Sequence, residues 1–262
     1  MLKTKNIGLF LGPLSFFLIL FFFHPEGLNP QANAVLASTA WVSIWWITEV
    51  IPIAVTSLLP IILFPLSGAM ELSLTTASFG HKYIFLYMGG FIIAIAIEKW
   101  NLHKRIALNI IYLVGSNIKR IILGFMLATA FLSMWISNTA TSVMMLPIGL
   151  AVINEFNTRL SNQDQDNSFG KALMLSIAYS ASIGGIATLV GTPPNIVFAG
   201  VVLETYNYEI TFFNWMIFGL PISLFLLFIC WKYLTNFAFS FKKNEFPGGK
   251  EEILKLKQDL GP

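Results

Sequence analysis

Long apolar runs follow one another along most of this sequence, and several are long enough to cross a lipid bilayer. A spanning helix needs about 20 apolar residues. The apolar runs lie at 7–23, 34–48, 51–67, 83–98, 121–136, 140–154, 171–189, 196–203 and 212–234. Only 11% of the residues are charged, whereas soluble domains have roughly 25%. The sequence therefore predicts an all-α polytopic membrane protein.

The lysines and arginines indicate how the chain is oriented in the membrane. With the N-terminus in the cytoplasm, the outer loops are 24–33, 68–82 and 204–211. These loops contain one basic residue, Lys82, and the other 15 of the 16 lysines and arginines lie on the cytoplasmic side. Cytoplasmic loops carry such an excess of Lys and Arg. We therefore expect a multi-pass protein of the inner (plasma) membrane with a cytoplasmic N-terminus.

A polar break at 133–141 interrupts the apolar sequence between two of the predicted helices. It contains hydroxyl and amide side chains and no charged residue. One helix is expected to end near Ile136 and the next to start near Ala140, after a run of three N-cap residue types. Backbone that leaves a helix inside a bilayer must be satisfied by protein, water or a bound ion. The break therefore indicates a binding site at membrane depth.

The helices on either side of this break, 121–136 and 140–154, are both short for a full crossing. Short helices that meet at a polar tip favour a re-entrant hairpin at 121–156, with its tip near the middle of the membrane. The distribution of basic residues does not distinguish this hairpin from two full crossings, because both return the chain to the same side.

A second polar break, at 184–195, has similar properties. Its Gly191 permits close approach of the backbone, and two consecutive prolines remove N–H donors and leave carbonyl groups that need partners. Thr192 and Asn195 are predicted to cap the helix that resumes at Ile196. A broken transmembrane helix is therefore expected here.

Both breaks offer hydroxyls, an amide, free carbonyls and a helix N-terminus. A helix N-terminus favours an anion, and carbonyl oxygens at the end of a broken helix bind a small cation. Neutral donors suit a transporter, since a buried arginine would cost more to desolvate and hold an anion too tightly. The alternative is that these small residues only pack helices together. Packing explains single residues better than it explains two long polar clusters.

Other kinds of functional site have little support in the sequence. The three histidines are far apart and form no metal-ligand pattern, so no transition-metal site is expected. Asp164 and Asp166 lie in a polar loop, where paired carboxylates have no apolar pocket to act in. The sequence has no phosphate-binding loop and no nucleotide fingerprint. We therefore expect no enzyme, no organic cofactor and no nucleic-acid partner.

The two breaks resemble the signatures of the divalent anion–sodium symporter family, whose members carry dicarboxylates, citrate or sulfate. The Ser-Asn-Thr motif of the family matches residues 137–139, and its second signature is similar to 182–195. The stretch 45–52, with the sequence WWITEVIP, resembles the junction between the second and third helices of the family. The resemblance covers essentially the whole chain.

The resemblance implies that the two breaks build a sodium site and a substrate site. It gives the sodium-binding role to Ser133, Ser137, Asn138 and Gly191. It gives the substrate-binding role to Asn138, Thr139, Thr192 and Pro193. Sodium would be the coupling ion, and the substrate would be a small divalent anion such as succinate, citrate or sulfate. The residues do not choose among these anions.

The resemblance also implies a scaffold that forms a homodimer and a transport domain that moves as an elevator. The expected parts are scaffold transmembrane helices at 1–103, an interfacial cytoplasmic helix at 104–120, the re-entrant hairpin at 121–156, a cytoplasmic loop at 157–170, a broken helix and last span at 171–241 and a cytoplasmic arm helix at 242–262.

Members of the family have two inverted repeats, each with one Ser-Asn-Thr hairpin and one broken helix, whereas this sequence has one of each. We therefore expect the chain to be the first repeat, the N-terminal half of a sodium-coupled symporter. The missing repeat would supply a second sodium site and half of the substrate contacts. Two alternatives remain: a structural membrane subunit that does not transport, and a sodium-independent anion exchanger that needs a second half.

Overall fold

The computed structural model describes residues 2–114, 117–158, 167–241, 254–255 and 257–258. Within 2–114, 117–158 and 167–241 the regular structure consists of twelve α-helices and one π-helical turn, without a β-strand, and residues 254–255 and 257–258 are also helical. The prediction of an all-α chain is confirmed. Most of the predicted loop at 157–170 and of the predicted arm helix at 242–262 lies outside the described residues.

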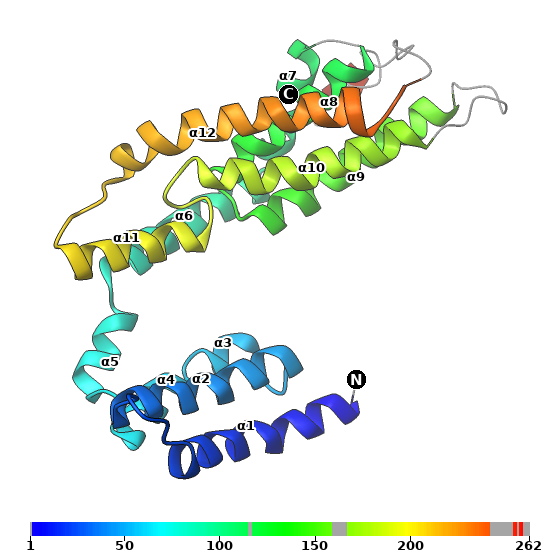
Figure 1. Cartoon of the computed structure of the whole chain (residues 1–262). Helices are drawn as coiled ribbons and strands as arrows, with labels where there is room; N and C mark the ends of the chain where they lie inside the picture. Colours follow the sequence, from blue (N-terminus) through cyan, green and yellow to red (C-terminus); the bar gives the residue numbers. More distant parts are fainter. Residues whose placement is uncertain (1, 115–116, 159–166, 242–253, 256, 259–262) are drawn as a thin grey trace. The chain divides into compact units, whose positions relative to one another are not determined.

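The chain divides into two compact units, Met1–Ile84 and Phe85–Pro262, which Figure 1 colours from blue to cyan and from cyan to orange. The predicted functional division, with a scaffold at 1–103, stays a prediction.

The first unit is built mainly from two long helices and three short ones. They are α1 (Leu2–Phe22), α2 (Pro30–Thr48), α3 (Ile53–Thr56), α4 (Leu59–Ser67) and α5 (Leu72–Phe79). Helix α1 runs alongside α2 (Figure 1), and the indole N–H of Trp45 donates to the carbonyl of Gly8 at 3.0 Å. Buried Phe16, Ala37 and Leu63 form the core of the unit.

Two features of this unit bear on the predicted spans. The irregular run 51–67 is divided between α3 and α4, as its prolines indicate, because proline interrupts the helical hydrogen bonds. The segment 68–82, predicted as an outer loop, contains α5. That helix has only eight residues, too few for its apolar period to stand out in the sequence.

The second unit holds the two polar breaks. Its helices are α6 (Lys82–Lys99, which starts at the end of the first unit), α7 (Leu102–Val114), α8 (Ile118–Ser133), α9 (Asn138–Thr158), α10 (Ser168–Ile186), α11 (Pro193–Tyr206) and α12 (Phe212–Tyr233), followed by the π-helical turn η1 (Leu234–Ala238).

Helix α8 lies at the centre of the second unit and packs against α7 and α10. Its Phe125 and Met126 are fully buried, and Phe169 of α10 joins the same core. A Cβ on Gly124 would lie 3.0 Å from the Cα of Ile111 in α7, so this glycine lets the two helices approach closely. The predicted interfacial helix at 104–120 thus begins with α7, which is held against α8.

Five helical stretches in the described part of the chain are long and apolar enough to cross a membrane. They are Thr4–Phe22, Leu72–Lys99, Asn138–Thr158, Ser168–Ile186 and Phe212–Ala238. Large apolar side chains on them are exposed, for example Phe10 at 73% in α1 and Phe218 at 67% in α12. So much exposed apolar surface is typical of side chains that face lipid. The chain is a multi-pass membrane protein.

The two helices beside the first break differ in length. Helix α8 has 16 residues and is therefore about 24 Å long, which is short of the roughly 30 Å hydrocarbon core. Helix α9 has 21 residues and meets the length requirement. The re-entrant hairpin at 121–156 stays a prediction.

Candidate functional site

The first break joins the end of α8 to the start of α9, at Ser133 and Asn138, a few residues earlier than predicted at the α8 end. Ser137 caps α9: its hydroxyl accepts from the N–H of Ala140 at 3.3 Å, and its carbonyl accepts from the N–H of Thr141 at 2.9 Å. Within the described part of the chain, the N–H groups of Asn138 and Thr139 donate no hydrogen bond. These two donors are available to an anion at the helix N-terminus.

Ser133 gathers three oxygen atoms at this break. Its hydroxyl oxygen lies 2.8 Å from the amide oxygen of Asn138 and 2.7 Å from the carbonyl oxygen of Ala181 in α10. The hydroxyl has a single proton, so it donates to one of these acceptors at a time. Ser133 is fully buried. Neutral oxygens grouped in this way are the ligands that a hard cation prefers.

The second break runs from the end of α10 at Ile186 to the start of α11 at Pro193. Thr192 occupies the N-cap position of α11, but its hydroxyl makes no capping hydrogen bond. Asn195 lies inside α11, and its amide donates to the carbonyls of Gly185 at 2.9 Å and Thr188 at 2.7 Å.

The prediction that Thr192 and Asn195 cap α11 is therefore wrong. A capping hydroxyl bonds to the N–H of the second or third helical residue. The second residue here is Pro194, which has no N–H. The N–H of Asn195, the third, donates to the backbone carbonyl of Thr192 at 3.2 Å, so the Thr192 hydroxyl is left without a capping partner.

Side chains from α12 donate hydrogen bonds to carbonyls at the second break that were predicted to be free. The indole N–H of Trp215 donates to the carbonyl of Ile186 at 2.9 Å, and the hydroxyl of Ser223 donates to the carbonyl of Ile183 at 2.9 Å. Together with Asn195, which donates to Gly185, they satisfy three carbonyl groups at the carboxyl end of α10. The sequence reasoning missed both α12 residues, although polar atoms in the most apolar span of the chain were a signal.

The two breaks contact each other at several points. The hydroxyl of Thr188, which is fully buried, donates to the carbonyl of Met134. A Cβ on Gly185 would collide with the amide oxygen of Asn138, and a Cβ on Gly191 would lie 2.5 Å from the carbonyl oxygen of Gly185. Asn138, Gly185 and Gly191 therefore lie against one another in that order.

The structure brings the predicted sodium residues together more clearly than the predicted substrate residues. Ser133 and Gly191 are buried, and Ser137 and Asn138 are partly buried. Asn138 and Gly191 lie against Gly185, Ser133 contacts Asn138, and Ser137 caps α9.

Of the predicted substrate residues, Thr139 and Pro193 are exposed and Thr192 is partly buried. No hydrogen bond between residues of the described ranges connects Thr139 with Thr192 or Pro193. Those ranges also contain no group of three or more His, Cys, Asp or Glu side chains that could hold a metal ion.

Comparison with known proteins agrees with these motifs. The sequence model of the citrate transporter family matches residues 43–257. The sodium-dependent dicarboxylate transporter SdcS of Staphylococcus aureus strain USA300 is 49% identical over 258 residues, covering 97% of this chain and 50% of the relative. The protein of the same name from strain bovine RF122 / ET3-1 is 48% identical over the same shares of the two chains.

The chain thus spans about half the length of the curated relatives it matches, as expected for one of two repeats. The resemblance to sodium-coupled anion symporters, drawn from residues 137–139 and 182–195, is confirmed. This chain belongs to the citrate transporter family.

Proposed function

We propose that this chain is the first repeat of a secondary active transporter that couples sodium to the movement of a small divalent anion. The observation that carries the proposal is the arrangement at the first break. The amide oxygen of Asn138 and the carbonyl oxygen of Ala181 lie within hydrogen-bond distance of the Ser133 hydroxyl, next to the free N–H groups at the start of α9. A cation and an anion therefore have ligands side by side.

The proposed sodium ligands are Ser133, Ser137, Asn138 and Gly191. Support comes from the contacts among them, since Asn138 touches both Ser133 and Gly185, and Gly191 lies against Gly185. The carbonyl of Ala181 adds an oxygen from a neighbouring helix. Neutral ligands hold a monovalent ion without the desolvation cost of a buried carboxylate.

The proposed substrate ligands are Asn138, Thr139, Thr192 and Pro193. The free N–H groups of Asn138 and Thr139 suit a carboxylate or sulfate oxygen, and the hydroxyl of Thr192 is available because it does not cap α11. Asn138 belongs to both proposed sites. A sodium ion there would reduce the cost of bringing an anion to the adjacent helix end.

The curated relatives suggest which anion to test first. The Staphylococcus aureus proteins are named as sodium-dependent dicarboxylate transporters, so a dicarboxylate such as succinate is the first candidate, with citrate and sulfate next. Transport rather than catalysis is proposed, with sodium as the coupling ion and no cofactor.

The mechanism we propose is an elevator. Sodium binds first and orders the tip of the hairpin, the anion follows, and the domain at 121–241 then moves relative to a dimeric scaffold at 1–103. The chain divides into its two compact units between residues 84 and 85, so most of α6 belongs to the same unit as the proposed transport domain, and the proposed boundary at 103 rests on the resemblance to the family. We further propose a location in the inner (plasma) membrane with the N-terminus in the cytoplasm. A second repeat would complete the substrate site.

Uptake of labelled succinate and labelled sulfate into proteoliposomes tests this function. The chain is reconstituted alone and joined to the genomic sequence that follows it, with either a sodium or a potassium gradient. We expect uptake by the joined protein in sodium only. Equal uptake with a sodium and with a potassium gradient would favour the anion exchanger, and no uptake by the joined protein would favour the structural subunit.

A further inference from the structure

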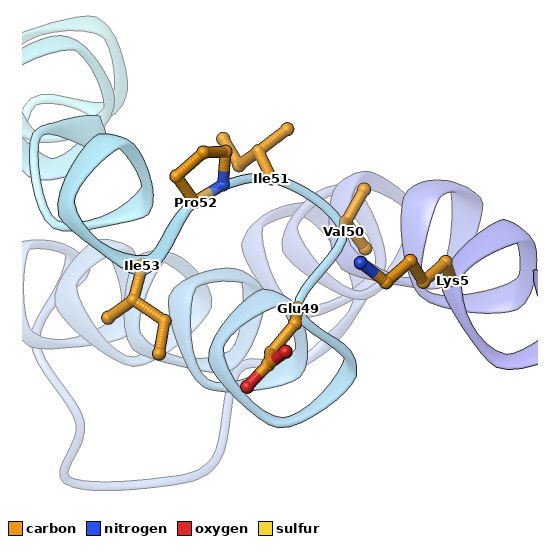
Figure 2. A pocket seen from close by; sticks show the side chains of 6 residues that line it. All are labelled: Lys5, Glu49, Val50, Ile51, Pro52 and Ile53. Atoms are coloured by element: carbon orange, nitrogen blue, oxygen red, sulfur yellow. The ribbon is translucent and has the colours of Figure 1, made fainter. Parts of the chain in front are cut away.

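A cavity in the first unit lies away from both polar breaks. It has a volume of about 350 Å³ and is lined by Lys5 from α1, Glu49 at the end of α2, the connection 50–52 and Ile53 at the start of α3 (Figure 2). Neither the proposed sodium site nor the proposed substrate site uses any of these residues.

Glu49 ends α2 in a left-handed conformation, with φ 47° and ψ 46°. Glycine and asparagine adopt this conformation readily, whereas a residue with a longer side chain does so at an energetic cost. A turn alone does not require a carboxylate at this position. The choice of glutamate therefore points to a use for its charge.

The cavity carries two opposite charges that do not pair. Lys5 and Glu49 are both exposed, and neither makes an ion pair or a side-chain hydrogen bond with another described residue. Figure 2 shows the ammonium of Lys5 directed toward Val50 and the carboxylate of Glu49 turned away from it. One cavity thus offers a cation and an anion at separate places.

The backbone beside Lys5 adds further donors. Within the described ranges, the N–H groups of Glu49, Val50 and Ile51 donate no hydrogen bond of ordinary geometry. Consecutive free N–H groups around a left-handed residue favour an anion. Together with the Lys5 ammonium they suit a phosphate group, while the Glu49 carboxylate suits an ammonium group.

The other residues that line the cavity restrict which phosphate- and ammonium-containing group it can bind. Ile51, Pro52 and Ile53 are apolar, and the lining contains no aromatic residue. Proteins usually hold quaternary ammonium groups in aromatic cages, so a choline headgroup fits poorly. A headgroup with a phosphate and no amine would leave the carboxylate of Glu49 without a partner. A primary ammonium linked to a phosphate matches both charges.

The position of the cavity suggests that the ligand comes from the bilayer. Lys5 lies at the start of the apolar stretch Thr4–Phe22, where a basic side chain meets the polar headgroups. We propose that Lys5, Glu49 and the backbone at 49–51 bind the headgroup of a phospholipid that carries a phosphate and a primary ammonium, as in phosphatidylethanolamine. This site is independent of the proposed transport function.

Lipid-dependent thermal stability of the purified chain in detergent tests the proposal. Phosphatidylethanolamine, phosphatidylcholine and phosphatidylglycerol with identical acyl chains are titrated separately. We expect phosphatidylethanolamine to raise the melting temperature at the lowest concentration. Lys5→Gln and Glu49→Gln should each weaken its apparent affinity about 10- to 100-fold, because each removes a hydrogen bond to a charged group.

Two matched variants serve as controls. Glu26→Gln changes another exposed carboxylate of the first unit, and Lys99→Gln changes an exposed lysine at the end of α6; both should keep the response to phosphatidylethanolamine. Equal responses to the three lipids, or unchanged responses in Lys5→Gln and Glu49→Gln, would overturn the proposal. Free phosphoethanolamine distinguishes a soluble ligand from a membrane lipid. If it stabilises the chain at a lower concentration than the lipid does, the ligand is soluble and the lipid proposal is wrong.

Discussion

The hydroxyl of Thr188 donates a hydrogen bond to the backbone carbonyl of Met134. The bond joins the segment after α10 to the end of α8, so that a side chain of the second break satisfies a carbonyl of the first. Thr188 is fully buried, and water is therefore a poor substitute for it at the Met134 carbonyl. The two breaks are one structural unit as well as one candidate site.

Thr188→Val tests this link, because valine keeps the shape of threonine and removes the hydroxyl. The carbonyl of Met134 would lose its donor from the buried Thr188, at a cost of about 1–2 kcal/mol, which corresponds to a fall of about 2–8 °C in melting temperature. Thermal unfolding of the purified chain measures the effect.

The matched control for this variant is Thr39→Val. The Thr39 hydroxyl is exposed and donates only to the carbonyl of Val35 in its own helix, so little change is expected. Equal melting temperatures for Thr188→Val and the unaltered chain would show that the link between the breaks does not contribute to stability.

Gly185→Ala should damage the proposed sodium site directly. The added methyl group would collide with the amide oxygen of Asn138 and displace a proposed ligand. We expect the apparent sodium affinity to fall about 10- to 100-fold, as is usual when the support of a metal ligand is altered. The readout is stabilisation of the protein by sodium relative to potassium at equal ionic strength.

Gly89→Ala is the control for that experiment, because a Cβ at Gly89 in α6 meets nothing within 4 Å. This change should leave the sodium response intact and, as a glycine replaced inside a helix, add roughly 0.5–1 kcal/mol of stability. An unaltered sodium response in Gly185→Ala would exclude the proposed position of the Asn138 amide.

His103 should make the stability of the second unit depend on pH. It is 3% exposed, and its Nδ1 lies 3.4 Å from the carbonyl of Ile97 at the end of α6. Burial lowers the pKa of His103; Lys104 lowers it further, while the carbonyl of Ile97 and the carboxylate of Glu98 oppose the shift.

The sign of the effect on stability follows from this lowered pKa. As the pH falls through about 6.5, the unfolded chain takes up a proton that the folded chain still excludes. The free energy of unfolding should therefore be highest above this pH, fall below it, and level off beneath the lowered pKa. Melting curves between about pH 5 and pH 8 measure it. His103→Gln should flatten the profile, whereas the exposed His24→Gln should not. Identical profiles for His103→Gln and the unaltered chain would refute this role.

The positions of the two breaks could be predicted from the sequence because their residue types are local signals. A run of serine, asparagine and threonine marks a helix start, and Ser137 does cap α9. The failed prediction for Thr192 was avoidable in principle, since two prolines after a capping residue leave the capping hydroxyl without the N–H it needs.

The donors that close α10 could not be predicted, because they depend on how distant helices pack. Trp215 and Ser223 lie 29 and 40 residues from the carbonyls they satisfy. The sequence of α12 does not show which side of the helix faces the break, because the helix is apolar on all sides and exposes Phe218 and Phe225. Only the folded arrangement shows which of its polar atoms meet the break.

The most direct test of the central claim, that the two breaks form a sodium site, is the thermal stability of the purified chain in sodium against potassium. At a sodium concentration of ten times the dissociation constant, binding should add about 1.4 kcal/mol. We predict this gain for the unaltered chain and for Asn154→Ala, an exposed residue of the same helix, and its loss in Asn138→Ala. Equal stability in the two salts, or a sodium gain that survives in Asn138→Ala, would contradict the account.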